Sequence, residues 1–474
     1  MYDCLIIGAG MSGLAAGIRC AHFGLRVAIL ERHTTIGGLN SFYRLAGRNY
    51  DVGLHAVTNF TPRGTKKGPL ARLLRQLRFS WEDLELAPQL GSAIAFPDCR
   101  LRFCNDPALL VEEVAHAFPG EVDGLRRLMA DLPDYDDLRP ELSTISARAR
   151  VAEYLRDPLL REMLFCPLMY YGSARAHDMD WGQFAIMFRS VLLEGFARPR
   201  DGVRVILKLL TRRFKELGGE LRLRTGVSKI NLVENRVVGV TLDDGTQLST
   251  KMVLSSAGWH ETARLCADIG DGSQVDTRDH SHPLAAGHPG DLTFIESISV
   301  LDCQPRDLGY NDTIVFFNDS PIFDYARPLS ALADVRSGVI CSPNNYAYAE
   351  GDLPEGIMRI TALANFDHWA SLEPAAYAGA KQTWYEQMVA SAVRFVPDFR
   401  PRVIATDMFT PTTIRRFTGH DNGAVYGLPE KLASGQTPIP GLYVCGTDQG
   451  WVGIVGSMVS GIMMANQYAL AASG

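Results

Sequence analysis

The sequence predicts an α/β fold built on a parallel sheet, and three observations near the N-terminus carry that prediction. Asp3 to Ile7 forms a short apolar run of the kind that parallel sheets bury. A glycine-rich turn, Gly8 to Gly13, follows directly, and a helix with apolar residues on one side leads to a second apolar run, Val27 to Leu30. Strand, glycine turn, helix and strand in this order are typical of a Rossmann-type β-α-β unit.

The glycine turn has the spacing G-x-G-x-x-G, and each glycine has a physical role. Gly8 permits the tight turn, Gly10 lets the backbone approach a pyrophosphate, and Gly13 lets the helix pack against the strand. The helix that starts here supplies main-chain N–H donors and the positive end of its dipole. We therefore assign Gly8, Ala9, Gly10, Ser12 and Gly13 to a dinucleotide-binding site.

Glu31 ends the second predicted strand, where a carboxylate accepts hydrogen bonds from both hydroxyls of a ribose. Its charge would repel a 2′-phosphate, so NADP is disfavoured. A Rossmann-like unit without a ligand is the alternative, because glycines are common in loops. The combination of strand, helix and acid favours a dinucleotide site over that alternative.

Length, charge and cysteine content limit the architectures and functions that the chain can have. With 474 residues the chain exceeds the size at which one hydrophobic core stops growing, so two domains are expected. A net charge of −6 without a compact Lys/Arg block argues against nucleic-acid binding. Nine cysteines without regular spacing suit free thiols in a reducing compartment, and the N-terminus does not have the pattern of a signal peptide. We therefore expect a cytoplasmic protein.

The stretch after Glu31, RHTTIGGLNSFYRLAGRNYDVGLHAV, contains a glycine pair that allows a second close approach of the backbone to a ligand. This stretch resembles the start of the FAD-dependent amine oxidase superfamily, and within it the phytoene desaturase, carotenoid isomerase and retinol saturase group. The resemblance implies FAD as the cofactor and FAD contacts from Arg32, Gly38, Leu39 and Asn40. It also implies that the YDVGLH turn approaches the isoalloxazine ring.

Two later blocks resemble the remainder of the FAD-binding domain in this superfamily. Residues 218–258 alternate apolar and polar side chains around two turns, which predicts a β-meander, and Val227 matches a residue whose backbone faces the adenine. Residues 441–470 predict a strand, a glycine-rich loop and a helix. There Asp448 matches the acid that hydrogen-bonds the ribityl chain, and Ile454 and Val455 match a helix N-terminus that stabilises negative charge on the flavin.

The C-terminal helix could instead be a membrane anchor, since it is long and largely apolar. A spanning helix needs roughly twenty predominantly apolar residues. Here Ser457, Ser460, Asn466 and Gln467, together with several glycines, interrupt the apolar run. We therefore expect this helix to form part of the FAD site.

The stretch TPTTIRRFTGHDNGAVYGLPE resembles the approach to the last FAD-domain strand in the same group. The resemblance thus implies a Rossmann-type, GR2-like FAD-binding domain that is discontinuous in the chain and made of residues 1–60, 200–270 and 401–474. The intervening residues, 61–199 and 271–400, are left for a discontinuous α+β substrate-binding domain.

Two residues are predicted to act near the flavin. His55 lies in the YDVGLH turn and is the best candidate for an acid, a base or an orienting group, although a structural histidine is an equal alternative. Trp451 precedes the C-terminal helix and could line the cavity, or simply pack under its loop. We predict no metal site, because His280, His282 and His288 lie among loop-forming residues at loose spacing.

The residues assigned to the substrate domain indicate less about function. Residues 157–196 are rich in Leu, Met, Phe and Tyr, which suits either a helical wall around an apolar small molecule or a ligand-free core. Four arginines nearby would suit peripheral contact with a membrane, or a solvated helix face. They are Arg148, Arg150, Arg156 and Arg161. The sequence does not predict the oligomeric state.

The resemblance implies an FAD-dependent oxidoreductase that acts on a long isoprenoid or polyene as a desaturase, saturase or isomerase, through chemistry at flavin N5. A flavin amine oxidase is the first alternative, and a lipid-binding protein similar to Rab escort proteins is the second. Two departures from the usual desaturase pattern weigh against simple phytoene desaturation: Asp201-Gly202 stands where Gly-Gly is common, and GWVGIVG does not contain the Pro-Gly-Gly of many desaturases.

Overall fold

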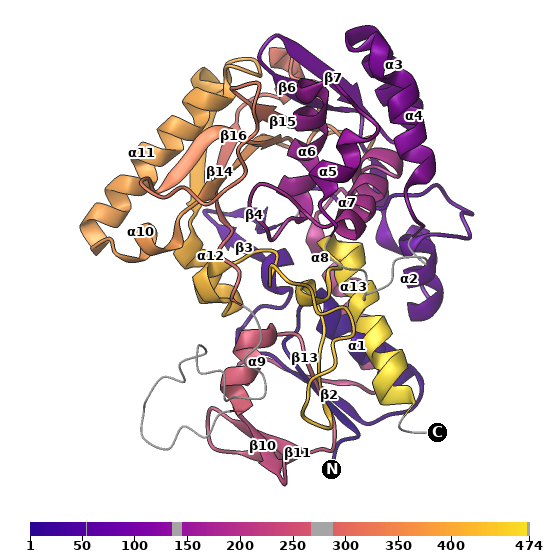
Figure 1. The fold of residues 1–474 in the computed structure, drawn as a ribbon. Helices are drawn as coiled ribbons and strands as arrows, with labels where there is room; N and C mark the ends of the chain where they lie inside the picture. The colour runs from indigo at the N-terminus through magenta and orange to yellow at the C-terminus, as the bar shows by residue number, and fades with distance from the viewer. Residues whose placement is uncertain (54, 135–144, 267–287, 472–474) are drawn as a thin grey trace.

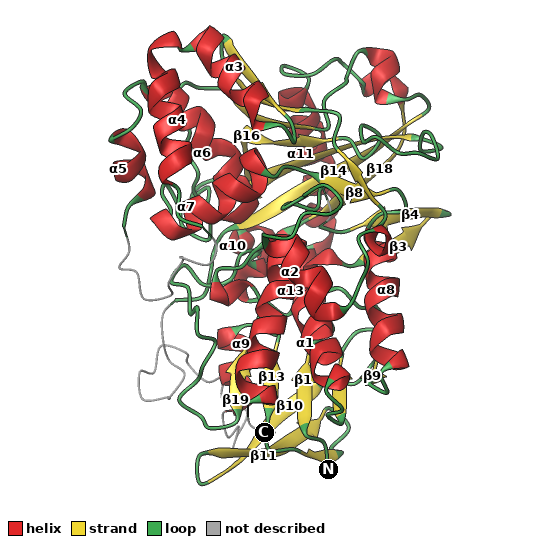
Figure 2. Ribbon diagram, turned by 90° about the vertical axis from the view of Figure 1, so that its right-hand side faces the viewer, coloured by secondary structure: helices red, strands yellow, loops and turns green. Residues whose placement is uncertain are grey.

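The structure is a computed structural model that describes residues 1–53, 55–134, 145–266 and 288–471. Both chain ends lie at the same end of the molecule, beside a parallel sheet, and a larger sheet with its helices occupies the other end (Figure 1). Seen from the side, helices cover both sheets, and the two sheets lie one above the other along the long axis of the molecule (Figure 2).

The parallel sheet contains, among the described residues, five strands in the order β19-β13-β1-β2-β9. Each neighbouring pair is parallel; for example, Ile6 of β1 pairs with Leu254 of β13 and with Ile29 of β2. The strands are β1 (Cys4–Ile7), β2 (Val27–Leu30), β9 (Glu220–Arg222), β13 (Val253–Ser255) and β19 (Leu442–Val444). The Rossmann-type sheet predicted from the first thirty residues is therefore confirmed.

The two faces of this sheet are covered differently. Cys4 and Ile6 of β1 belong to a core formed with helices, whereas Leu5 and Ile7 point to the opposite core. That second core is closed by an antiparallel sheet of three strands within the described residues, β10 (Val227–Val233), β11 (Arg236–Leu242) and β12 (Gln247–Ser249). The predicted β-meander thus packs as a layer on the parallel sheet.

Helices cover the other face, among them α1 (Met11–His22), α8 (Val203–Glu216) and α13 (Gly453–Met464), which continues as a π-helical segment, Ala465–Leu470. The α1 and α13 helices come from opposite ends of the chain and cross at very short distance. A Cβ atom on Gly461 would lie 2.0 Å from the carbonyl oxygen of Ser12. Only glycine permits this backbone contact. The contact brings the N-terminus of α13 beside the first glycine turn.

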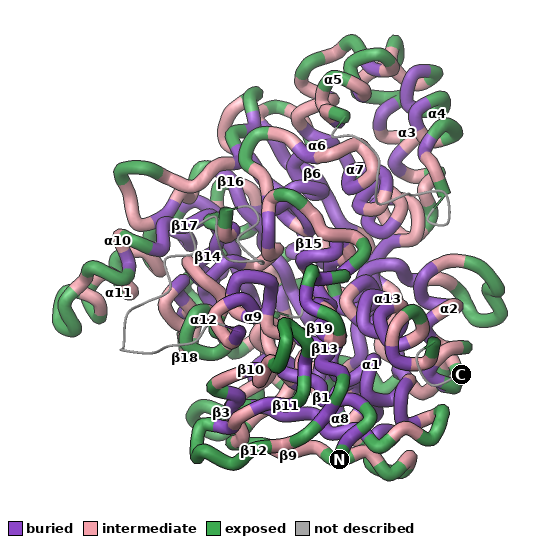
Figure 3. The backbone as a smooth tube through the Cα atoms, turned by 60° about the horizontal axis from the view of Figure 1, so that its bottom comes forward, coloured by how far each residue is buried: buried purple, intermediate pink, exposed green. Residues whose placement is uncertain are grey.

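The larger sheet has, in the described part of the chain, seven strands in the order β18-β14-β17-β16-β15-β6-β7. All neighbours are antiparallel except β15 and β6. Its strands are β6 (Ser92–Phe96), β7 (Cys99–Phe103), β14 (Thr293–Leu301), β15 (Ile314–Asn318), β16 (Ala333–Cys341), β17 (Gly356–Ala364) and β18 (Val403–Phe409). Figure 3 shows that its inner strands are mostly buried, whereas the edge strand β18 is largely half-buried or exposed.

Helices pack on both faces of the larger sheet. One face meets α11 (Pro374–Ala392), with α10 (Phe366–Ala370) beside it. The other face meets the apolar helices that the sequence places around a ligand or in a core. These are α3 (Pro107–Ala117), α4 (Val122–Asp131), α5 (Ala147–Ala152), α6 (Pro158–Gly172) and α7 (Trp181–Phe188).

Short elements connect the two halves. Two small antiparallel pairs are β3 (Phe42–Leu45) with β4 (Arg48–Asp51), and β5 (Leu86–Pro88) with β8 (Ala197–Pro199). Three further helices are α2 (Pro69–Leu77), α9 (Trp259–Cys266) and α12 (Pro411–Thr418). None of the helices in the described ranges has the length and apolar composition needed to cross a bilayer.

The predicted segment boundaries differ from the structure in two places. Leu70, Leu73 and Leu77 of α2 pack in the same core as α1 and α13, although the prediction places residues from 61 onward in the substrate domain. The β18 strand pairs with β14 of the larger sheet, although the prediction places residues from 401 onward in the FAD domain. Both differences depend on pairing between distant segments, which local sequence patterns do not reveal.

The crossing of α1 and α13 makes a testable prediction. Gly461→Ala places a methyl group against the backbone of Ser12, which cannot rotate away as a side chain would. We expect a loss of about 1–3 kcal/mol of stability and weaker retention of any ligand held by the two helix N-termini. The midpoint of thermal unfolding measures the first effect.

Gly379→Ala is the matched control for this variant. Gly379 lies within α11, and a Cβ atom added there would have no neighbouring atom within 4 Å. The alanine should leave stability unchanged or raise it by about 0.5–1 kcal/mol, since alanine favours the helix. Equal effects of the two substitutions would contradict the importance of the Gly461 contact.

Candidate active site

A cavity of about 560 Å³ extends from the first glycine turn to the larger sheet. Its polar end is lined by both glycine turns, Glu31 and several cationic side chains. Its other end is lined mainly by apolar and aromatic side chains. Those residues are Tyr170, Tyr171, Met187, Phe294, Val339, Phe409, Val425, Tyr426 and Val452.

The polar end is formed largely by the main chain of the two glycine turns, which begin at Gly8 and Gly37, and we call this part of the site the cradle. The amide of Gly37 donates to the carbonyl of Ala9 over 2.9 Å, and Gly10 and Gly37 form a parallel bridge, so the two glycine turns lie side by side. Gly37 has a φ of 110°, and a Cβ atom there would lie 2.8 Å from the carbonyl oxygen of Asn40. A side chain at this position would therefore distort the wall of the cradle.

Two helix N-termini open onto this cradle. Gly10 precedes α1 and Val452 precedes α13, and neither helix start has a side-chain cap. Gly10, Ser12, Gly453 and Ile454 line the cavity. Uncapped first-turn N–H groups with the positive ends of two helix dipoles bind negatively charged groups.

Cationic side chains add to this donor set. Arg32, Arg264, Arg415 and Arg416 line the polar end of the cavity. Arginine is suited to phosphate recognition because its guanidinium presents several donors in one plane. The polar end therefore has the donors that a diphosphate requires.

Glu31 joins the first glycine turn to the end of β2. Its carboxylate accepts hydrogen bonds from the amide of Ala9 at 2.8 Å and from the amide of His33 at 2.9 Å. The side chain is buried and lines the cavity. Each oxygen retains a lone pair, so the carboxylate can still accept from a ribose.

Asp448 also binds main-chain amides. Its carboxylate accepts from the amides of Trp259 at 2.7 Å and Leu428 at 2.8 Å, so it connects α9, residue 428 and the loop before α13. It lines the cavity, as expected for a residue that contacts a cofactor. A hydrogen bond to a ribityl chain stays a prediction and would use the remaining lone pairs.

Most of the predicted site residues come together at this cavity. Those that line it are Gly8, Gly10, Ser12, Glu31, Arg32, Gly38, Leu39, Asn40, His55, Val227, Asp448 and Ile454. The carbonyl of Val227 accepts a hydrogen bond from Arg32 at 3.0 Å, which explains how residues in distant blocks meet.

Four predicted residues do not line the cavity. The amide of Ala9 is used by Glu31, and Gly13 has the packing role predicted for it, because a Cβ atom there would lie 2.1 Å from the carbonyl oxygen of Gly8. Val455 is buried in the core with α1. Trp451 lies against Gly456 in the first turn of α13 and does not line the cavity, which favours the packing alternative predicted for it.

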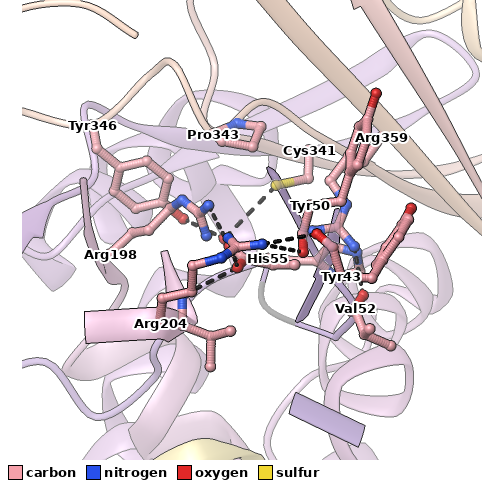
Figure 4. Close-up of polar contacts among 12 residues, drawn as sticks. Tyr43, Tyr50, Val52, His55, Arg198, Arg204, Cys341, Pro343, Tyr346 and Arg359 are labelled. Atoms are coloured by element: carbon pink, nitrogen blue, oxygen red, sulfur yellow. Dashed lines mark hydrogen bonds and ion pairs between the residues drawn. The ribbon is translucent and has the colours of Figure 1, made fainter. Parts of the chain in front are cut away.

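His55 lies on the cavity wall near the apolar end and is held from several sides. Its Nε2 is 3.1 Å from Glu296 Oε2 and 3.3 Å from the Thr361 hydroxyl. Its carbonyl accepts from the Tyr346 hydroxyl at 2.9 Å and from Cys341 Sγ at 3.8 Å. Figure 4 shows Tyr346 and Cys341 directed at the His55 segment. The larger sheet thus fixes both the ring and the main chain of His55.

Glu296 is a buried carboxylate with a cationic partner. Arg359 Nε donates to Glu296 Oε1 over 2.5 Å, and another guanidinium nitrogen of Arg359 donates to the carbonyl of Val52 over 2.6 Å. Burial alone would raise the pKa of Glu296, but the charge of Arg359 and the contact with His55 outweigh it and lower the pKa. Glu296 is therefore ionised at neutral pH.

Asp51 anchors the other side of the same turn. It accepts hydrogen bonds from Arg198 at 2.6 Å and from Arg204 at 3.4 Å. Arg204 also donates to the carbonyls of Tyr43 and Tyr50, and Figure 4 shows Arg198, Arg204 and Arg359 gathered around the turn. The YDVGLH segment is consequently held by charged contacts at both of its ends.

Sequence reasoning missed Glu296, Arg359 and Thr361. A signal for the first two was present, since Glu296 is the single charged residue in the apolar run TFIESISVL and Arg359 is the single one in GIMRITALA. A lone charge in an otherwise buried strand indicates a partner or a function. Arg415 and Arg416 entered the sequence analysis only as part of a resemblance, although they line the polar end.

No cluster of three or more potential metal ligands is found in the described residues. His280 and His282, which the sequence places in a loop, lie outside those residues. His288 lies at the edge of the described range.

The cradle, the acid after β2 and the paired helix N-termini define a Rossmann-type protein with a site suited to a nucleotide cofactor. A family model described as "Flavin containing amine oxidoreductase" matches residues 11–266. The chain therefore belongs to this family, and it is a flavin-dependent oxidoreductase. The donor set of the polar end fits such a cofactor, because it offers main-chain N–H groups and arginines to phosphates and a carboxylate to a ribose.

The chain is similar to several characterised proteins. It is 22% identical to prolycopene isomerase 2, chloroplastic, of an Oncidium hybrid cultivar, over 99% of this chain and 84% of that protein. It is 21% identical to all-trans-retinol 13,14-reductase of Danio rerio, over 97% and 84%. The structure of cyclohexylamine oxidase from Brevibacterium oxydans matches with a TM-score of 0.63 at 15% identity, covering 100% of both chains. This last likeness shows the fold.

Glu31 provides the first prediction for this site. Glu31→Ala removes the acceptor for ribose hydroxyls and frees the amide of Ala9, so flavin retention should weaken by about 1.5–3 kcal/mol for each lost charge-assisted hydrogen bond, or roughly tenfold or more. Titration of the apoprotein with flavin nucleotide measures the affinity. Glu216→Ala, on the exposed end of α8, is the control and should bind normally. Unchanged affinity in Glu31→Ala would contradict the assignment.

His420 provides a pH prediction. Burial would lower its pKa, but Glu261, Asp448 and Asp421 outweigh burial and raise the pKa above the ordinary value; the Nδ1 atom is 3.7 Å from Glu261 Oε1. A raised folded-state pKa contributes stability that is fully present below about pH 6.5 and is lost as pH rises through the folded-state value. His420→Gln should therefore lower the thermal midpoint most near pH 6 and progressively less toward pH 9.

An exposed histidine on α3, His116, gives the control for this pH effect. His116→Gln should shift the midpoint equally at all these pH values. A His420→Gln difference that stays constant from pH 6 to pH 9 would show that the Glu261 contact does not stabilise the fold through charge.

Proposed function

We propose that the protein is an FAD-dependent oxidoreductase that acts on a long apolar isoprenoid or polyene. The observation that carries this proposal is the continuity of one cavity from the nucleotide cradle into a chamber walled by aromatic, aliphatic and Met side chains. A small polar substrate would not need such a wall, whereas an extended hydrocarbon gains free energy along its whole length.

FAD is favoured over a mononucleotide by the far end of the cavity. Glu31, Arg32 and Val227 line the cavity beyond the glycine turn, where an adenosine would lie in a Rossmann-type unit. The relatives support the substrate class, since their names refer to prolycopene and retinol. With FAD bound, the cofactor would supply two-electron chemistry at N5.

The residues of the chain position the substrate for this chemistry. The aromatic wall from α6 and β14 excludes water and holds an apolar chain in an extended form. His55, Glu296 and Thr361 form a hydrogen-bonded polar group beside the apolar side chains, so we assign the making or breaking of bonds to this part of the wall.

A flavin amine oxidase is the alternative function, supported by the fold of cyclohexylamine oxidase. The lining residues within the described part of the chain contain no lysine. Lys431 is half-buried, and desolvation lowers its pKa to about 8; it donates to the carbonyl of Thr447 at 3.2 Å and does not line the cavity. Lys381 lies on α11 and does not line the cavity either. A polyene substrate is therefore favoured over an amine.

The complete donor set of the cradle argues against a lipid-binding protein without catalysis, because such a protein would not need those donors. Membrane contact through the arginines near α5 is weakened, because Arg148 pairs with Glu162 and Arg150 with Glu153. A cytoplasmic location stays a prediction.

The experiment uses the purified holoprotein. Denaturation should release FAD, identified by chromatography and mass, and the flavin absorbance is then followed without oxygen against a panel of carotenes, retinoids and amines. We expect a carotene or retinoid to change the redox state of the flavin, or to be converted with pre-reduced flavin. Bleaching by an amine alone would overturn the proposal in favour of an amine oxidase. A colourless protein that takes up no FAD would favour the lipid-binding alternative.

A further inference from the structure

We propose that His55 and Glu296 form a proton-transferring pair on the chamber wall, in which His55 exchanges a proton with the substrate and Glu296 and Arg359 are positioning residues. The proposal rests on the proposed function and narrows it: the reaction adds or removes hydrogen across a carbon–carbon bond, rather than isomerising a double bond without proton transfer.

The hydrogen-bond pattern fixes the tautomer of the His55 ring. Glu296 is ionised and can only accept, and its Oε1 atom is already bound by Arg359. Its Oε2 atom, 3.1 Å from His55 Nε2, therefore requires a proton on Nε2. The neutral ring then carries its lone pair on Nδ1, for which no hydrogen-bond partner is found among the described residues. His55 lines the cavity and its side chain is 14% exposed, from which we infer that this nitrogen is the one that meets a ligand.

Burying the charges of Glu296 and Arg359 costs electrostatic free energy, which a functional role would explain. The side chains of Glu296 and Arg359 are 10% and 2% exposed, and apolar residues of similar volume would hold two strands and a turn together at no electrostatic cost. A hydrocarbon substrate needs no charged wall for binding. A carboxylate behind a histidine, by contrast, stabilises the imidazolium that forms when the ring takes a proton.

The step balances for a two-electron reaction. In the dehydrogenating direction, one C–H bond of the substrate loses its hydrogen with both electrons to oxidised flavin. The neighbouring C–H bond loses its proton to His55 Nδ1, and the electron pair left behind closes a C=C bond. In the opposite direction the His55 imidazolium would give its Nδ1 proton to one carbon of the C=C bond, and the other carbon would receive its hydrogen with both electrons from a bound reduced flavin. An external electron acceptor or donor restores the flavin.

Glu296→Gln is the decisive variant, because it keeps the shape of the side chain. Arg359 will still bind the amide oxygen, so the new NH2 group will face His55 and turn Nε2 into an acceptor. The ring proton should then move to Nδ1, and the lone pair facing the substrate is lost. We expect turnover to fall by a factor of about 10²–10⁴ with normal flavin content.

The measurement has two parts. Ring nitrogen resonances of the ¹⁵N-histidine-labelled holoprotein, assigned with His55→Gln, should show Nε2–H in the native protein and Nδ1–H in Glu296→Gln. Turnover is measured with the carotene or retinoid that reacts in the panel, in the single variants and in the double variant. The two single losses should not add, since both remove the same pair.

Glu355→Gln is the matched control. Glu355 binds Arg48 through Nε at 2.8 Å, a second Glu–Arg pair near the larger sheet that does not line the cavity. Its substitution should change neither the His55 tautomer nor turnover.

Each outcome decides the proposal. A native ring with its proton on Nδ1, or a Glu296→Gln variant that changes tautomer but turns over within threefold of the native rate, would show that Glu296 is only a structural clamp. A native protein that converts none of the carotenes or retinoids would defeat the proposed function, and the proton role with it. Flavin loss in Glu296→Gln alone, with the native tautomer retained, would also overturn the pair.

Discussion

The backbone contact between α1 and α13 is the constraint on which the site depends. Gly461 lies directly against the carbonyl of Ser12, and the Ser12 hydroxyl is 2.8 Å from that of Ser256 after β13. Because of this packing, three chain segments that are hundreds of residues apart share one surface. Two uncapped helix N-termini consequently open toward the same cavity, and neither segment could bind a dinucleotide phosphate as well alone.

The features that could be predicted from sequence are those fixed by short-range chemistry. The turn from β1 to α1 and the acid after β2 are encoded within Asp3 to Glu31, where periodicity and glycine spacing determine the conformation. The C-terminal block was predictable through its resemblance. In contrast, the prediction placed β18 in the FAD-binding domain, because the sequence of this strand does not reveal whether it pairs with β14 or β19. The packing of α2 on α13 was missed for the same reason, because it depends on contacts between distant segments.

The residues of the chamber wall also could not be predicted from local sequence patterns. Glu296 and Arg359 face each other because β14 and β17 are antiparallel neighbours, with Glu296 opposite Thr361. His55 reaches them from a turn more than two hundred residues earlier. Each lone charge is visible in its strand, but its partner depends on sheet register. For Trp451 the sequence left two alternatives open, lining the cavity or packing under its loop, because proximity to the α13 N-terminus does not determine where the side chain lies.

The YDVGLH turn connects the two halves energetically. Asp51 at its start is bound by Arg198 and Arg204, and His55 at its end is bound by Glu296 and Tyr346 of the larger sheet. A Cβ atom on Gly53 would lie 2.3 Å from the carbonyl oxygen of Leu39, so the same turn also supports the second glycine loop. One short segment therefore contacts both the second glycine loop of the cradle and the strands that hold His55. The geometry of the cradle and the position of His55 consequently depend on the same few residues.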